Sequence, residues 1–338
     1  MDTIPSLVSE PVAVPASNDT VATPAWDALV DPDVRALAAL VASPLLVAAD
    51  AAAIPTLDDD WRMASLTARH DWLRKLDAAP QALRNHLAGS NARQLGRYAE
   101  ALWQFWFANL PGAHLYAAGL MVKEGSAVRG EFDFIVSLPG LPGVQHLEMG
   151  YKFYLHCPPG DGFSRLFGPN PIDRLDRKWQ HMLASQLPLS QTPLGRSALP
   201  AGADQVVPRA CLQGWIFYPL EGKSAAAIPG LSPTHWRGWW CHQNDRRATW
   251  SSLAQAWCIL PRLHWIASAA LRDGADASSS AECAGQLRAH FSRSSQPQLI
   301  AGLAPGRDRV WRESVRIFVV PPSWPQTAAG PVHSATSN

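Results

Sequence analysis

Four charged side chains lie in two successive stretches of the sequence that alternate between apolar and polar residues. Glu131 and Asp133 occupy polar positions of the first stretch, and Glu148 and Lys152 occupy polar positions of the second. Clustered carboxylates suit a hard divalent cation such as Mg²⁺ or Mn²⁺. A lysine beside them can stabilise charge that develops on a phosphate or on an attacking water. The residue types therefore predict metal-assisted phosphodiester chemistry.

The two alternating stretches, residues 130–138 and 144–155, are predicted to form a hairpin. Five residues rich in glycine and proline join them, and a loop of this length favours antiparallel pairing. In such a hairpin Asp133 lies opposite Glu148 or Gly150, and directly opposed Cβ atoms are about 5 Å apart. Gly150 also removes a side chain where a ligand would need room.

Strand periodicity assigns the charged residues to one face of this hairpin and large apolar residues to the other. An alternative remains open, in which the charged face is solvated and its ion pairs are ordinary surface pairs. Helices on both sides of the sheet would instead place the charges in a cleft. The expected apolar face comprises Phe132, Phe134, Val136, Leu138, Leu147, Met149, Tyr151, Phe153 and Leu155.

The segments around the hairpin predict a mixed α/β core. Asn170 is a good N-cap, Pro171 suits the first helical position and Asp173 suits the positive end of the helix dipole. The second helix is therefore expected to begin at residue 170. The expected order is a helix at 91–110, strands at 114–122, 130–138 and 144–155, a helix at 170–187 and a strand at 210–220.

The remaining chain is predicted to flank this core of residues 91–220. Prolines at positions 44, 55 and 80 interrupt the helical pattern that precedes it. A helix near 281–291 and a strand at 315–320 are the clearest later elements. The predicted divisions are a flexible acidic leader at 1–30, a helical extension at 31–90, an aromatic-rich C-terminal extension at 221–325 and a flexible tail at 326–338.

The charge distribution favours a polyanionic partner. The chain has 29 basic and 28 acidic residues, but residues 1–60 contain ten of the acids and a single basic residue. Residues 61–338 therefore carry 28 − 18 = +10, which is compatible with binding to DNA or RNA. A scattered surplus of solvated arginine is the alternative.

Composition narrows the protein class. With 47% hydrophobic and 17% charged residues, the chain is not wholly disordered. Five scattered cysteines, without a CxxC pair, indicate reduced thiols and neither a disulfide framework nor a zinc ribbon. No secretory signal or membrane-spanning segment is evident. We therefore expect a cytoplasmic protein without a membrane partner; its oligomeric state stays open.

The predicted order, with an acid on the second strand and an acid plus lysine on the third, resembles the PD-(D/E)XK phosphodiesterase superfamily, which includes restriction endonucleases. The chain is more specifically similar to a bacterial family called domain of unknown function 1853, which is grouped with that superfamily. The resemblance implies a restriction-endonuclease-like αβββαβ core over residues 91–220, with family-like patches continuing to Trp324. Segments that carry it are LGRYAEALWQFW, GEFDFIV, HLEMGYKFYL, GPNPIDRLDRKWQHMLASQLPLS and GWIFYPL.

The resemblance also implies roles for individual residues. Asp133 and Glu148 would be the metal ligands, and Lys152 would orient water or stabilise the transition state. Glu100 on the first helix would be a further ligand or would hold a metal-bound water; its alternative is a surface acid paired with a helix neighbour. This sequence departs from the usual acid, one residue, lysine spacing, because Gly150 stands in the lysine position and Lys152 follows two residues later.

Other residues are weaker candidates for the same site. Arg174, Lys178 and His181 recur at helical spacing and could contact a phosphate backbone, or could form a solvated face. Glu131 is a candidate auxiliary acid. The leading hypothesis is a Mg²⁺-dependent nuclease acting on DNA or RNA. The alternatives are a catalytically inactive nucleic-acid-binding or adaptor protein on the same fold, and a protein unrelated to nucleic acids.

Overall fold

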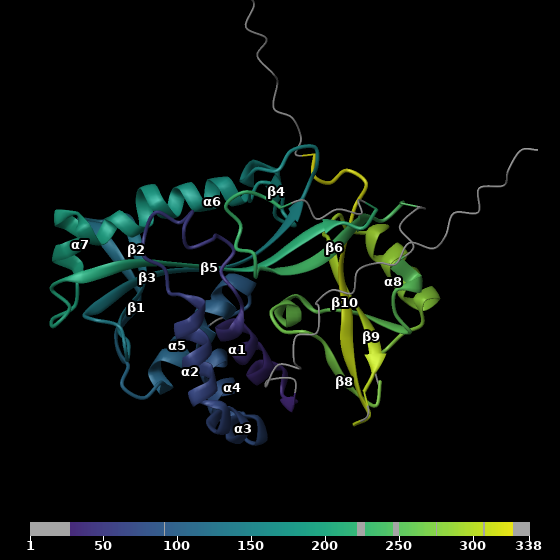
Figure 1. The fold of residues 1–338 in the computed structure, drawn as a ribbon, viewed down its shortest axis with the longest axis horizontal. Coiled ribbons are helices and arrows are strands. Elements are labelled where there is room, and N and C mark those ends of the chain that lie inside the picture. Colours follow the sequence, from purple (N-terminus) through teal and green to yellow (C-terminus); the bar gives the residue numbers. More distant parts are fainter. Residues whose placement is uncertain are drawn as a thin grey trace, which may run out of the picture.

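The computed structural model describes residues 28–90, 92–221, 227–245, 250–274, 276–306 and 308–326. The predicted leader and tail fall outside these ranges, except for residues 28–30 and 326. Figure 1 shows the fold. The helices are α1 (Pro32–Ala42), α2 (Asp59–Ala68), α3 (His70–Ala78), α4 (Gln81–Gly89), α5 (Leu95–Asn109), α6 (Leu175–His181), α7 (Pro193–Ala198) and α8 (Ser280–Phe291).

The strands of the described residues form one mixed sheet of ten strands. Its order is β1-β2-β3-β5-β6-β10-β9-β7, with β4 paired to β3 and β8 paired to β10. Strands β3, β5, β6 and β10 pair in parallel, and the other pairs are antiparallel. The strands are β1 (His114–Glu124), β2 (Ala127–Ser137), β3 (Val144–His156), β4 (Leu166–Phe167), β5 (Val206–Pro219), β6 (Trp236–His242), β7 (Ala256–Ile259), β8 (Ala270–Arg272), β9 (Gln298–Pro305) and β10 (Val310–Val320).

Helices cover both faces of the half of the sheet that contains β1, β2, β3 and β5. Helices α1 to α5 gather on one face, and α6 and α7 lie on the other (Figure 1). On the first face the ring of Phe107 from α5 packs edge-on against Phe134, with centroids 5.3 Å apart. On the second face Trp179 and Met182 are buried with Tyr154 of β3. The architecture is therefore mixed α/β, as the sequence predicts.

Most elements lie where the sequence predicts them, but the second core helix begins late. The predicted N-cap, Asn170, accepts a hydrogen bond from the Ile172 N–H at 3.2 Å and forms a turn. Helix α6 starts at Leu175, so Asp173 stays outside it and its carboxylate is free to contact β3. The prediction of a helix start at residue 170 is wrong, because this local turn competes with the helix. After α6 the chain continues as a π-helical turn at Met182–Gln186 and a 3-10 turn at Leu187–Gln191.

The alternation predicted for β2 fails at one position. Phe134 belongs to the core under α5, but the ring of Phe132 packs against His146 on the opposite face, with centroids 4.7 Å apart. Phe132 and Phe134 therefore lie on opposite faces, which corrects the expectation that they share one. The phase of β2 changes at Asp133, the residue between them, and this is where β2 begins to leave β3.

Candidate functional site

Asp133 and Glu148 face each other where β2 and β3 separate. The antiparallel pairing of these strands runs from Ser137–Val144 to Phe134–Leu147, and its continuation by one residue sets Asp133 opposite Glu148. The Asp133 carboxylate takes the place of the next strand partner, because its Oδ2 accepts the main-chain N–H of Met149 at 2.8 Å. The opposed arrangement of the two acids is thus set by strand register.

Both carboxyl groups hold their protons more tightly than free side chains do. Burial, followed by the charge of Glu148, raises the pKa of Asp133 to about 8. Burial raises the pKa of Glu148 to about 7, although Lys178 and hydrogen bonds with Asp133 act in the opposite direction. Two like charges in a buried setting need either a shared proton or a cation. At this position either a retained proton or a cation would satisfy the two carboxyl groups.

Protein donors hold Glu148 rigidly from two sides. Its side chain is fully buried; Oε1 lies 2.8 Å from His146 Nε2, and Oε2 accepts from Gln186 Nε2 at 2.5 Å. Burial lowers the pKa of His146 to about 4, so its imidazole is neutral at physiological pH. His146 Nδ1 lies 2.9 Å from Ser190 Oγ, which supports the tautomer that donates from Nε2 to the carboxylate. Each carboxylate oxygen keeps a second lone pair for another ligand.

The lysine nearest to the acids is Lys178 of α6. Its Nζ donates to Gln186 Oε1 at 2.8 Å, and Gln186 in turn donates to Glu148. Burial lowers the pKa of Lys178, while the charges of Asp133 and Glu148 raise it. A Cβ built on Gly150 would lie 3.6 Å from the Lys178 Cε. The same Cβ would lie only 2.9 Å from Leu212 Cδ1, so Leu212 leaves no room for a side chain at this position, and the stem of Lys178 passes beside the glycine from another element.

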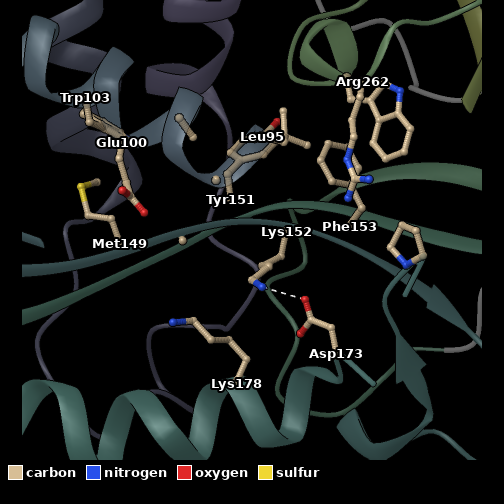
Figure 2. Close-up of a pocket in the computed structure, with 15 residues that line it drawn as sticks. Leu95, Glu100, Trp103, Met149, Tyr151, Lys152, Phe153, Asp173, Lys178 and Arg262 are labelled. Carbon is tan, nitrogen blue, oxygen red and sulfur yellow. Dashed lines mark hydrogen bonds and ion pairs between the residues drawn. The ribbon is translucent and has the colours of Figure 1, made fainter. Parts of the chain in front are cut away.

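Lys152, which the resemblance assigns to water or to the transition state, forms an ion pair with an acid outside the pair Asp133 and Glu148. Its Nζ forms an ion pair with Asp173 Oδ2 at 2.7 Å, and the Tyr154 hydroxyl lies 3.2 Å from Asp173 Oδ1. Asp173 can reach β3 because it lies before α6 and not within it. The structure therefore places Lys152 on the predicted face but pairs it with Asp173 (Figure 2).

Glu100 forms the ion pair with a helix neighbour that the alternative interpretation predicts. It pairs with Arg97 on the same helix, with Arg97 Nη1 2.7 Å from Glu100 Oε2, and Arg97 also lies 3.4 Å from Glu131 Oε1. Together with Glu131 and Asp133, Glu100 also lines a hollow of about 200 Å³ between α5 and β2. Glu131 therefore belongs to the margin of the site, where it forms a longer ion pair with Arg97.

The three residues predicted as a phosphate-binding stripe point in different directions. Arg174 precedes α6 and forms an ion pair with Asp176. Lys178 turns toward the acids, as described above. His181 is exposed and lines a hollow with Asp133 and Gln186. The stripe is therefore not one surface, because the N-terminal residue of the three lies outside the helix.

A recess of about 290 Å³ lies beside the two acids, which are not part of its lining, and follows β3; we call it the β3-edge recess. It is lined by α5, by residues 149–153 of β3, and by Asp173, Lys178 and Arg262. Figure 2 shows Glu100 above the strand and Lys152, Lys178 and Asp173 below it. The same view shows Arg262 reaching in from a segment far along the chain.

The donor set of the site fits Mg²⁺. No group of three or more histidine, cysteine, aspartate or glutamate side chains arranged around a metal position occurs among the described residues. Asp133 and Glu148 are two oxygen donors that lie together with raised pKa values. Mg²⁺ characteristically takes one or two carboxylates and completes its shell with water and phosphate oxygens. The two acids meet that requirement without a third protein ligand.

Sequence reasoning did not assign His146, Gln186 and Ser190 to the site. One signal was available for His146, since it lies two residues before Glu148 and strand alternation sets both on one face. No local signal identifies Gln186, which lies in the π-helical turn after α6. Its contact with Glu148 spans 38 residues and depends on how that turn packs.

Comparison with known proteins identifies the family. A model of the family "Domain of unknown function (DUF1853)" matches residues 35–320, and the chain belongs to that family. No curated protein matches the chain, and no solved structure matches it. In the described part of the chain no helix has both the length and the apolar character needed to cross a membrane.

Proposed function

We propose that this protein is a metal-dependent phosphodiesterase that hydrolyses DNA or RNA. The order α5-β1-β2-β3-β4-α6-α7-β5 supports a relation to the PD-(D/E)XK superfamily, since it is the αβββαβ order of that core with the two-residue strand β4 and the short helix α7 inserted. Strand β3 pairs antiparallel with β2 and parallel with β5, so the core part of the sheet is mixed. Helices lie on both of its faces (Figure 1).

One observation carries the proposal, namely the buried pair Asp133 and Glu148 at the point where β2 and β3 separate. Burial is the main cause of both raised pKa values, and the charge of Glu148 raises the pKa of Asp133 further. A pair with a structural role would be expected to have a cation bound directly to it. Among the described residues, Lys178 reaches the pair only through Gln186. The arrangement favours a site that is completed by a metal ion and a phosphate.

The chemistry follows from the residues at the site. Asp133 and Glu148 would hold Mg²⁺, which when bound supplies Lewis-acid activation of water and neutralises phosphate charge. Hydrolysis forms a bond from the water oxygen to phosphorus and breaks the bond to the leaving oxygen. Lys178, oriented by Gln186, would donate a hydrogen bond to a phosphate oxygen and stabilise the charge that develops there. His146 keeps the Glu148 carboxylate in a fixed orientation.

Nucleic acid is the proposed substrate because of the charge on the body of the protein. Residues 61–338 carry 28 − 18 = +10. A basic body attracts the phosphate backbone by a mechanism that depends on salt and not on base sequence. The net charge alone does not distinguish DNA from RNA.

The decisive experiment measures cleavage of labelled single- and double-stranded DNA and RNA with Mg²⁺, Mn²⁺ or EDTA. The wild-type protein is compared with Asp133→Asn and with the control Asp204→Asn, an exposed acid outside the site. We expect metal-dependent cleavage that Asp133→Asn reduces by about 10³-fold or more, because a metal ligand supplies several kcal/mol of stabilisation. The control should keep wild-type activity.

Two outcomes would contradict the proposal. Cleavage that persists in EDTA, or that is equal in Asp133→Asn and wild type, would exclude the metal mechanism. Salt-dependent binding of nucleic acid without any cleavage, unchanged in Asp133→Asn, would support the binding or adaptor protein instead.

A further inference from the structure

Strand β3 has one edge that is only partly covered by other strands. It pairs with β2 only as far as Leu147 and with β4 only from Leu155 onward. The main-chain N–H of Met149 points across this edge and donates to the Asp133 carboxylate. In a strand, the main-chain N–H and C=O groups of every second residue point to the same edge. The main-chain groups of Tyr151 and Phe153 therefore point toward the β3-edge recess. No strand of the described chain pairs with this part of the edge.

Positive side chains follow the same recess from the acids outward. Lys178 lies beside the acids, Lys152 lies farther along β3, and Arg262 lies at the far wall. Lys152 is paired with Asp173, whereas Arg262 has no ion-pair partner among the described residues and is exposed. Its guanidinium lies 5.5 Å from the ring centroid of Trp265, which restricts its movement. A guanidinium held in this way can bind a phosphate or stack on a base.

The depth of the site restricts what can reach it. The Glu148 side chain has no exposed surface, and the recess holds about 290 Å³, close to the lower end of the range for small-molecule sites. Proteins read a duplex by inserting a protruding helix or ribbon into a groove. Here the acids lie in a gap of the sheet between α5 and α6, so a duplex would have to enter the protein. A single strand needs far less room.

We infer that the β3-edge recess binds a single strand of nucleic acid, with its phosphates toward Lys178, Lys152 and Arg262. This inference rests on the proposed function and names its substrate as single strands or unpaired ends. The recess and the hollow at Asp133 share Glu100 as a wall, so a strand in the recess leads toward the acids. The free main-chain groups of β3 add donors and acceptors that do not depend on base sequence.

The test measures binding separately from hydrolysis. Fluorescence polarisation with the full-length Asp133→Asn protein, in EDTA, compares a labelled 12-nucleotide single strand with the blunt duplex of the same sequence, in DNA and in RNA. We expect the single strand to bind about 10-fold or more tightly than the blunt duplex, for DNA, for RNA or for both. Adding Arg262→Gln should weaken binding of that strand and reduce the slope of log K against log salt by about 0.7. Adding Arg196→Gln, an exposed arginine outside the recess, should leave both unchanged.

The outcomes separate this inference from the proposed function. Equal or tighter binding of the blunt duplex, or identical effects of Arg262→Gln and Arg196→Gln, would overturn the single-strand recess even if wild type cleaves nucleic acid. Single-strand preference that depends on Arg262 would support the recess, even if wild type cleaves nothing and the hydrolytic function fails.

Discussion

Two buried glutamates in the same sheet have opposite electrostatic surroundings. Glu313 of β10 forms an ion pair with Arg316, whose Nε lies 2.7 Å from Glu313 Oε1, and both side chains are at most 5% exposed. Glu148 of β3 is also buried, but its side chain contacts the neutral His146 and Gln186, and none of its hydrogen bonds in the described part of the chain comes from an arginine or a lysine. Burial alone therefore does not indicate a functional site. The distinguishing feature is a buried carboxyl group with a raised pKa and no directly bound arginine or lysine among the described residues.

The residues of the Glu313 ion pair also hold distant segments of the chain together. Arg316 donates to the main-chain oxygens of Trp265 and Ala267, both at 2.6 Å, and Glu313 accepts the Ala269 N–H at 2.8 Å. These bonds fix the segment that carries Arg262 into the β3-edge recess. The two glutamates therefore differ in their partners: Glu313 is ion-paired within the protein, whereas Glu148 is the one that we propose binds a ligand.

The largest effect is expected from Glu313→Gln. Removing one partner of a buried ion pair leaves the Arg316 charge uncompensated and should reduce the free energy of unfolding by about 3–5 kcal/mol. Urea unfolding monitored by tryptophan fluorescence measures this change. Glu148→Gln serves as the matched variant and should lose much less stability. If both variants lost the same free energy of unfolding, the proposed difference between Glu313 and Glu148 would be wrong.

The next effect concerns the two lysines. Lys178→Met should reduce kcat by about 10²–10³-fold, as expected when a group that stabilises transition-state charge is removed. Lys152→Met should have a smaller effect on kcat, because Lys152 pairs with Asp173. Single-turnover cleavage assays at saturating substrate would measure both. If Lys152→Met reduced kcat more than Lys178→Met does, Lys152 and not Lys178 would be the lysine that stabilises the transition state.

A smaller effect, on the affinity for Mg²⁺, is expected when a hydrogen-bond partner of Glu148 is removed. His146→Leu removes the ring nitrogen that lies 2.8 Å from Glu148 Oε1 and should weaken Mg²⁺ binding by about 10–100-fold. Isothermal titration calorimetry of the metal alone would measure this loss. Ser190→Ala, one step farther from the carboxylate, should weaken binding less. Unchanged Mg²⁺ affinity in His146→Leu would show that His146 has no positioning role.

The smallest effect is a pH dependence of stability. The folded-state pKa of Asp133 is about 8 against an ordinary value of 3.8, so between these values the folded protein keeps a proton that the unfolded chain releases. Stability in EDTA should therefore fall as the pH rises through this window. Between pH 5 and pH 8 the free energy of unfolding should decrease less in Asp133→Asn than in wild type. The expected difference is at least about 1.4 kcal/mol, the equivalent of one pKa unit. Urea unfolding midpoints at the two pH values provide the measurement, and an unchanged pH slope in the variant would contradict it.

Local sequence determined the core strands and the opposition of the two acids. Alternation with period two defines β2 and β3, and a loop of five residues restricts their register, so Asp133 and Glu148 can be predicted as neighbours. The prediction failed where short-range contacts compete. The turn at Asn170 delays α6, and the change of phase at Asp133 moves Phe132 to the other face.

Only the tertiary structure decided which other groups meet the acids. Gln186 contacts Glu148 across 38 residues, and the π-helical turn that presents it has no sequence signature. Lys178 occupies the space beside Gly150, and Arg262 reaches the β3-edge recess from the C-terminal third. Strand pattern and loop length act over a few residues, so they determine pairs within a hairpin. Contacts between distant segments depend on how whole helices pack, and that packing arises from the summed burial of many side chains.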